Sequence, residues 1–153
     1  MNSKQKLLIE QLDRKILPLK VLNKTVIPPK GWIYTIRIAL GMSLRQLSGR
    51  LDKAPQSIKD MEEREENGSI MLKTLKEVAN GLDMKLVYGF IPKEDSIEQM
   101  IEKRAYEIAT EIVLRTSNTM KLEDQENSKE RIDEAIKNRA EEISYLMPKY
   151  LWD

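Results

Sequence analysis

Near the middle of the chain, five residues with polar or conformationally restricted side chains fall within six positions: Pro55, Gln56, Ser57, Lys59 and Asp60. The amide of Gln56 can form two hydrogen bonds with adenine, and the carboxylate of Asp60 can accept one from cytosine N4. Ser57 and Lys59 can reach base edges or phosphate oxygens. If this segment is a helix with these side chains outward, their types predict contacts with bases in the major groove of duplex DNA.

A second set of residues flanks these five and has groups that can bind phosphate oxygens: Ser43, Arg45, Arg50 and Lys53. Phosphate contacts fix the position of a protein on DNA, whereas base contacts determine its sequence preference. The competing interpretation is that a small helical core with a charged surface gives the same pattern without touching DNA. We expect DNA contact, because the turn between the helices and the basic charge of this part of the chain both favour it.

The apolar residues of 43–64 predict two short helices joined by a tight turn. The first helix has three leucines that share one face: Leu44, Leu47 and Leu51. Ser43 precedes them as a candidate N-cap, and Pro55 opens the second helix at a position that tolerates a missing N–H. Ile58 and Met61 place the second helix on the same core. This arrangement is typical of a helix-turn-helix whose second helix enters the major groove.

Two more helices are expected to complete a compact domain over residues 31–84. The first covers 31–40, with Ile33, Ile36 and Leu40 inward and Gly41 as a left-handed cap. We expect Trp32 to anchor the preceding connector onto this domain. The last helix begins at or just after Ser69 and ends near 80–83.

The N-terminal region, residues 1–30, is predicted to contain a helix and a connector. The helix covers 3–17, with Leu8, Leu12 and Ile16 on its inner face and Pro18 at its end. The segment 19–30 should be extended. Its lysines could follow a phosphate backbone, although the simpler expectation is that they are solvated while the helix packs on the body of the protein.

One short segment within 85–92 is rich in residues that favour strands: Lys85, Leu86, Val87, Tyr88, Gly89, Phe90 and Ile91. A single strand leaves its edges unpaired, and we find no convincing partner strand elsewhere in the chain. We expect it to pair with the same strand of a second copy in a homodimer. The alternative is an extended tail lying on the helical domain.

The last part of the chain, 93–153, is predicted to be a helical hairpin. Apolar residues repeat at three and four over 97–116 and again over 132–147, with a polar loop at 117–128 between them. The ending Tyr150, Leu151 and Trp152 could be a docking peptide for a partner, but we expect it to fold back onto the hairpin.

The composition excludes several classes of site. Cysteine and histidine are both absent, which excludes disulfides, zinc fingers and Ser-His or Cys-His nucleophiles. The glycines are isolated and do not form a phosphate-binding loop. We therefore expect neither an enzyme, nor a metal, nor a cofactor. No apolar run is long enough to cross a membrane and the N-terminus does not resemble a secretory signal, so a cytoplasmic protein is expected.

The net charge of +1 conceals an asymmetry along the chain. Residues 1–60 contain twelve Lys or Arg and four Asp or Glu, whereas residues 61–153 contain fourteen and twenty-one. A basic half followed by an acidic half suggests a nucleic-acid face and a separate partner face. The simpler explanation is that solvated charges on amphipathic helices happened to segregate.

Residues 36–83 resemble the phage repressor and Cro-type helix-turn-helix domain, most closely in APQSIKDME at 54–62. The resemblance implies that Pro55, Gln56 and Asp60 face bases and that Glu62 is structural. The sequence departs from the family pattern in three places: Leu44 replaces a phosphate-binding Gln, Asp52 the turn glycine, and Lys53 an apolar residue.

Over nearly its whole length the chain is similar to the mobile mystery protein A family. The similarity includes PPKGWI at 28–33 and NGSIMLKTLKEVANGLDMKLVYGFIPK at 67–93. That family is encoded on mobile elements, often beside a Fic-domain protein, which implies a regulator or antitoxin paired with an AMP-transferring toxin. The motif by which some Fic antitoxins block ATP is absent.

The sequence as a whole predicts a mainly α protein that acts as a homodimeric, sequence-specific transcriptional regulator bound to double-stranded DNA. The alternative is an antitoxin-like module that neutralises a partner enzyme through its acidic C-terminal half without binding DNA.

Overall fold

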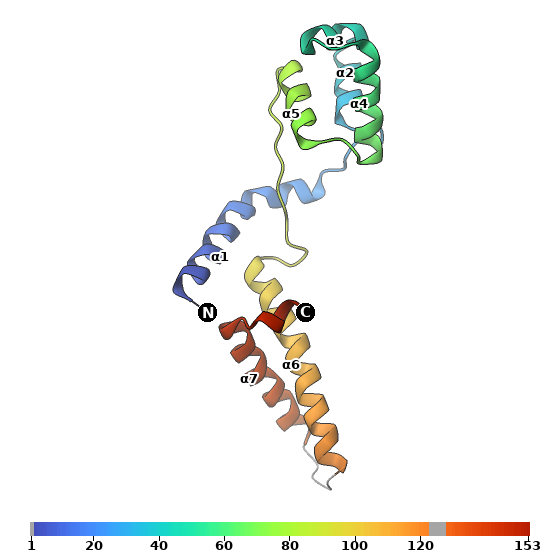
Figure 1. Ribbon diagram of the computed structural model, residues 1–153. Coiled ribbons are helices and arrows are strands. Elements are labelled where there is room, and N and C mark those ends of the chain that lie inside the picture. Colours follow the sequence, from blue (N-terminus) through green and yellow to red (C-terminus); the bar gives the residue numbers. More distant parts are fainter. Residues whose placement is uncertain (1, 123–127) are drawn as a thin grey trace. The chain divides into compact units, whose positions relative to one another are not determined.

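A computed structural model describes residues 2–122 and 128–153, which are almost entirely helical (Figure 1). Seven α-helices and two 3-10 helices lie within these ranges, and no strand does: α1 Ser3–Ile16, η1 Leu17–Lys24, α2 Trp32–Ala39, α3 Leu44–Leu51, α4 Pro55–Asn67, α5 Leu72–Gly81, α6 Ile97–Leu122, α7 Lys129–Leu146 and η2 Lys149–Trp152. The mainly helical class and the C-terminal pair of helices are confirmed.

The chain divides into two compact units. The α2–α5 unit comprises residues 24–89, and the hairpin unit comprises the first 23 residues together with 90–153. The basic first sixty residues are therefore divided between the two units, because five of their twelve basic residues belong to the hairpin unit. The α2–α5 unit has eleven basic and eight acidic residues, so its excess of positive charge is smaller than the half-chain count suggests.

The core of the α2–α5 unit contains one apolar side chain from each helix and Leu82, the residue after α5: Ile33, Leu47, Ile58, Val78 and Leu82. Leu47 and Ile58 are fully buried, as the spacing of the apolar residues predicts. The partly buried Leu44, Leu51 and Met61 pack around them. Burial of a Leu or Ile side chain stabilises a fold by about 1.5–3 kcal/mol, so this small cluster is the main support of α3 and α4.

Local backbone conformations set where α3 and α4 begin and end. Ser43 and Gln46 form a reciprocal capping box at the start of α3, and Gly41 before it has the predicted left-handed conformation with φ of 64°. Asp52 ends α3 in the left-handed region, where an Asp is tolerated in place of glycine. Pro55 then occupies the first turn of α4.

One prediction for α2 is wrong: Leu40 is exposed, and the inner face contains Arg37 instead. The reason is that α2 ends at Ala39, one residue before Leu40, so that the C-terminal apolar residue leaves the helical face. Trp32, which was expected to anchor the preceding connector, is 44% exposed.

The core of the hairpin unit lies between α6 and α7: Ile101, Ala105, Ile108, Ala109, Ile136, Ala140, Ile143 and Leu151. The chain end folds back as predicted, because Leu151 is fully buried and Arg104 Nε donates to its carbonyl oxygen at 2.9 Å. Trp152 remains half exposed, so Leu151 is the anchoring residue. The polar loop predicted at 117–128 is wrong in its first part, since α6 continues to Leu122 and Ser117 is buried. Residues 123–127 of that loop lie outside the described residues.

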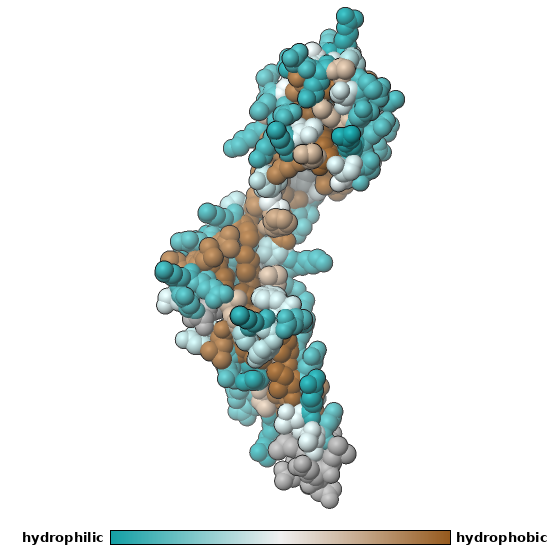
Figure 2. All heavy atoms as spheres, in the orientation of Figure 1, coloured by the Kyte–Doolittle hydropathy of each residue, from teal (hydrophilic) through white to brown (hydrophobic). Residues whose placement is uncertain are grey.

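Helix α1 contacts α6 through a different face from the predicted one. Ile9 packs against the hairpin core, whereas Leu8 and Leu12 are exposed. The carboxylate of Asp13 accepts hydrogen bonds from the backbone N–H groups of Ile97 at 2.8 Å and Glu98 at 3.3 Å, and so caps α6. Figure 2 shows the resulting apolar surface over the part of the molecule that contains α1.

Of the two segments predicted to be extended, one is partly helical and the other has no partner strand in the described chain. The first part of 19–30 is helical, because η1 continues to Lys24. Residues 85–91 form no strand, and no backbone hydrogen bond joins them to another described part of the chain. A lone extended segment has no neighbour with which to form a ladder. Within 2–122 and 128–153, no helix is both long and apolar enough to cross a membrane.

Candidate nucleic-acid interface

Helix α4 is fixed to its unit by the face opposite the candidate DNA-contact residues. Ile58 is fully buried in the core and Met61 packs beside it. One turn further along, Glu62 is also buried, with 7% of its surface exposed. A buried carboxylate needs a charged or hydrogen-bonding partner, and the structure supplies one from α2.

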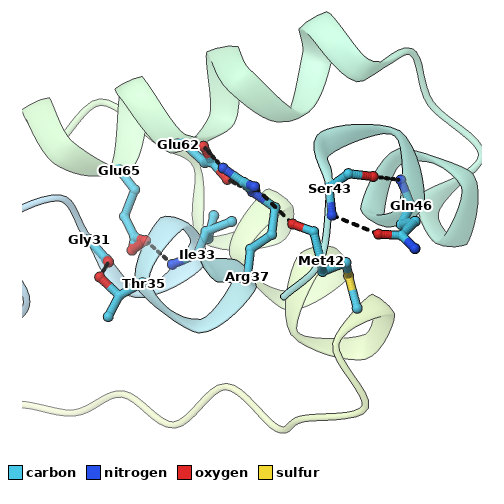
Figure 3. Close-up of polar contacts among 9 residues, drawn as sticks. All are labelled: Gly31, Ile33, Thr35, Arg37, Met42, Ser43, Gln46, Glu62 and Glu65. Atoms are coloured by element: carbon cyan, nitrogen blue, oxygen red, sulfur yellow. Dashed lines mark hydrogen bonds and ion pairs between the residues drawn. The ribbon is translucent and has the colours of Figure 1, made fainter. Parts of the chain in front are cut away.

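The partner of Glu62 is Arg37, which is also only 7% exposed. Arg37 Nε donates to Glu62 Oε1 at 2.6 Å, and Nη2 donates to Oε2 at 3.2 Å (Figure 3). The remaining nitrogen, Nη1, donates to the carbonyl oxygen of Met42 at 2.9 Å. This bidentate pair joins α2, α4 and the turn before α3, and it explains the structural role that the resemblance implies for Glu62.

A second glutamate of α4 caps α2. Glu65 Oε1 accepts from the backbone N–H of Ile33 at 2.8 Å (Figure 3). Glu65 Oε2 accepts from the backbone N–H of Trp32 at 3.0 Å. Gly31, the residue before α2, has φ of 82°, and a Cβ there would lie 2.7 Å from Glu65 Oε1. Two of the four glutamates that make α4 acidic in sequence therefore hold the fold together and do not form its outer surface.

The five candidate base-contact residues lie together on the first turns of α4. Pro55, Gln56 and Lys59 are exposed, and Ser57 and Asp60 are partly buried. Gln56 Nε2 donates a hydrogen bond to Asp60 Oδ1 at 3.0 Å, as residues four apart on a helix can do. Helix α4 thus presents an outer surface on which no other part of the α2–α5 unit lies over Gln56 or Lys59.

A hollow of about 290 Å³ lies beside this surface, between α4 and the start of α5. Ser57, Asp60 and Arg64 line it from α4, and Met71 and Thr74 line it from the α5 side. Its lining also includes Lys53, so two cationic side chains, Lys53 and Arg64, and one carboxylate, Asp60, border the hollow.

The structure does not leave all four candidate phosphate-contact residues free. Ser43 Oγ accepts from the backbone N–H of Gln46 at 3.1 Å, in the capping box. Arg50 Nη1 donates to Gly81 O and to Asp83 Oδ2, both at 3.1 Å. Lys53 Nζ lies 3.9 Å from a carboxylate oxygen of Glu77, at the limit of an ion pair.

Arg45 and Lys59 differ from these residues. Both are exposed, and neither has a side-chain partner among the residues that the structure describes. They are the sequence-predicted cations of this surface that remain available to an external phosphate.

The sequence-based prediction missed three residues that position the site: Arg37, Gln46 and Glu65. An indication of the first was present, because Arg37 lies four residues after Ile33 on the inner face of α2. A charged residue at an inward helical position requires a partner, and Glu62 follows Ile58 at the same spacing on α4. The part of the chain that the structure describes has no cluster of three Asp or Glu residues placed to hold a metal ion.

The chain has no significant match among protein-family models, curated proteins or solved structures.

Proposed function

We propose that this chain is a sequence-specific DNA-binding transcriptional regulator that places the first turns of α4 in the major groove. The observation that supports this most directly is the division of α4 into two faces. Ile58 and Glu62 are buried against α2 and α3, whereas Gln56 and Lys59 are exposed. A short helix held by one face beneath a tight turn, with polar side chains on the other, suits insertion into a groove.

The charge distribution supports the same proposal. Glu62 and Glu65 point toward α2, which removes two carboxylates from the surface that would approach DNA. Arg45 and Lys59 are free to contact phosphates, and each phosphate contact contributes affinity by releasing counterions. Gln56 and Asp60 then supply the groups that distinguish bases.

The proposal includes a homodimer that pairs through residues 85–91. Val87, Tyr88 and Phe90 are strongly exposed, and this extended segment has no backbone partner among the described residues. Exposed apolar side chains next to unpaired backbone groups are suited to pairing with a second strand. A two-fold dimer would present two copies of α4 to two half-sites.

The sequence resemblances to known families add a biological role to the proposal. A repressor-like domain in a chain similar to mobile mystery protein A suggests an autoregulator encoded on a mobile element, paired with a Fic-domain protein. The alternative, a protein-binding antitoxin module, depends on an acidic C-terminal half. The hairpin unit, however, has fifteen basic and seventeen acidic residues, so its net charge is weak and the DNA-binding proposal has the stronger support.

The test is a gel-shift titration with the duplex upstream of the chain's own gene. The double variant Gln56→Ala with Lys59→Ala should lose at least about tenfold in affinity, because a bidentate base contact and a phosphate contact are both removed. The matched control is Gln99→Ala with Lys129→Ala, which removes the same two residue types from exposed positions of α6 and α7. Equal losses in both variants, or no complex with the wild-type chain, would exclude the proposed role of α4.

A further inference from the structure

The hydrogen bond between Gln56 and Asp60 determines which way the Gln56 amide faces. Gln56 Nε2 donates to Asp60 Oδ1 at 3.0 Å, from one turn of α4 to the next. An ionised carboxylate can only accept hydrogen bonds, so the nitrogen of the amide, and not its oxygen, must face Asp60. Asp60 is partly buried, whereas Gln56 is exposed.

This contact leaves a defined pair of groups on the free side of the amide. One of the two N–H groups of Nε2 is used by Asp60, and the second N–H and the carbonyl Oε1 remain. A donor beside an acceptor is the arrangement that matches adenine, whose major-groove edge offers the N7 acceptor and the N6 donor. Guanine offers two acceptors, N7 and O6, so one of them would face Oε1 without a proton between them.

We propose that Asp60 is a positioning residue that fixes the Gln56 amide in the orientation that selects adenine over guanine. The inference rests on the proposed DNA-binding function and deepens it by assigning a base preference. Asp60 adds negative charge near the phosphates, so its expected effect on total affinity is unfavourable. Its contribution is to discrimination between bases.

The test is selection of bound sequences from a pool of randomised duplexes by the full chain. The wild-type chain should enrich a motif with adenine at one position of each half-site, and Gln56→Ala should lose the preference at that position. Asp60→Ala should reduce the adenine-to-guanine ratio there by about three- to tenfold, as expected for loss of one typical intramolecular hydrogen bond. Asp60→Asn should give an adenine-to-guanine ratio between those of the wild-type chain and Asp60→Ala, because an Asn side chain can either accept from or donate to Gln56.

A matched variant separates orientation from charge. Glu63→Ala removes another carboxylate of α4, which is exposed and has no partner among the described residues. Both Glu63→Ala and Asp60→Ala should bind all duplexes more tightly at low salt, because less negative charge faces the phosphates. Only Asp60→Ala should change the base ratio. Thermal unfolding of each variant, followed by circular dichroism, checks that the fold is kept, and Asp60→Asn replaces Asp60→Ala if the latter is unstable.

The possible failures are distinguishable. If the wild-type chain enriches no sequence, the proposed function is wrong and the inference fails with it. If a motif is enriched but Gln56→Ala leaves it unchanged, base contact by this amide is excluded. If Gln56→Ala removes the preference and Asp60→Ala leaves the ratio within about twofold of the wild-type value, the positioning role of Asp60 is overturned while DNA binding stands.

Discussion

Replacement of Glu62 by alanine should destabilise the α2–α5 unit severely. The substitution removes both bonds from Arg37 to the carboxylate, at 2.6 and 3.2 Å. It leaves the buried guanidinium with the carbonyl of Met42 and, 5.5 Å from its centroid, the ring of Tyr34. Removal of one member of a buried ion pair costs about 3–5 kcal/mol, since the other charge stays buried without compensation.

This loss is comparable with the whole stability of the unit. At roughly 0.05–0.15 kcal/mol per residue, residues 24–89 should have a free energy of unfolding of about 3–10 kcal/mol. Glu62→Ala is therefore expected to bring the unit close to its unfolding midpoint at 25 °C. The double substitution Arg37→Met with Glu62→Leu should recover most of the stability, because apolar residues of similar volume remove the buried charge altogether.

The two tryptophans provide an assay for each unit. Trp32 lies in the α2–α5 unit and Trp152 in the hairpin unit, and the chain has no other tryptophan. In a Trp152→Phe background, the fluorescence of Trp32 during urea unfolding reports on the α2–α5 unit. The neighbouring exposed Glu63→Ala is the control and should change the free energy of unfolding by less than about 0.5 kcal/mol. A loss under about 1 kcal/mol for Glu62→Ala would refute the role given to the ion pair.

Three further outcomes are expected. Asp13→Ala should destabilise the hairpin unit by about 1 kcal/mol, seen in Trp152 fluorescence of a Trp32→Phe chain, because the first two N–H groups of α6 lose their acceptor while the bond from Gln99 N to Ser96 Oγ remains; an unchanged midpoint would contradict this. Gly31→Ala should lower the free energy of unfolding of the α2–α5 unit by at least about 1 kcal/mol, since the new Cβ meets the carboxylate of Glu65 at a positive φ; a neutral effect in urea unfolding would show that this contact can relax. Tyr88→Cys should form a symmetric intermolecular disulfide on mild oxidation, because antiparallel pairing centred on residue 88 brings the two copies of this residue together. The natural chain has no cysteine, so no other disulfide can form. A purely monomeric product on a non-reducing gel would exclude that register.

Features that depend on local sequence could be predicted well. The start of α3 at its Ser43 cap, the start of α4 at Pro55 and the left-handed Gly41 all follow from the conformational preferences of single residues and their neighbours. The burial of Leu47 and Ile58 follows from helical spacing, which is a property of a few consecutive turns.

Features that depend on a distant partner could not be predicted in this way. Arg50 was expected to contact phosphate, yet its partner Asp83 lies more than thirty residues away in sequence. The inner face of α1 was placed on Leu8 and Leu12, but Ile9 faces the core, and Asp13, one turn further along the same side, caps α6. With apolar residues around much of α1, spacing alone does not decide which of them face inward.

The end of α6 shows a third kind of error. The polar residues from Ser117 onward were predicted to form a loop, because asparagine and serine are common in turns. Ser117 is instead buried within the long helix α6, where it is 4% exposed. Tertiary packing outweighs the weak preference of single polar residues against a helix, which spans only tenths of a kcal/mol.

Whether the outer face of α4 contacts DNA is tested most directly by the salt dependence of binding. The wild-type chain and Lys59→Ala should each be titrated with the upstream duplex at several salt concentrations between about 50 and 200 mM. For each phosphate contact, the logarithm of the affinity should fall by about 0.9 for each unit increase in the logarithm of the salt concentration. If the outer face of α4 contacts DNA, the decrease is linear and steep for the wild-type chain, and the slope is smaller by about one contact per chain for Lys59→Ala. Equal slopes for the two chains, or no binding at the lowest salt, would contradict it.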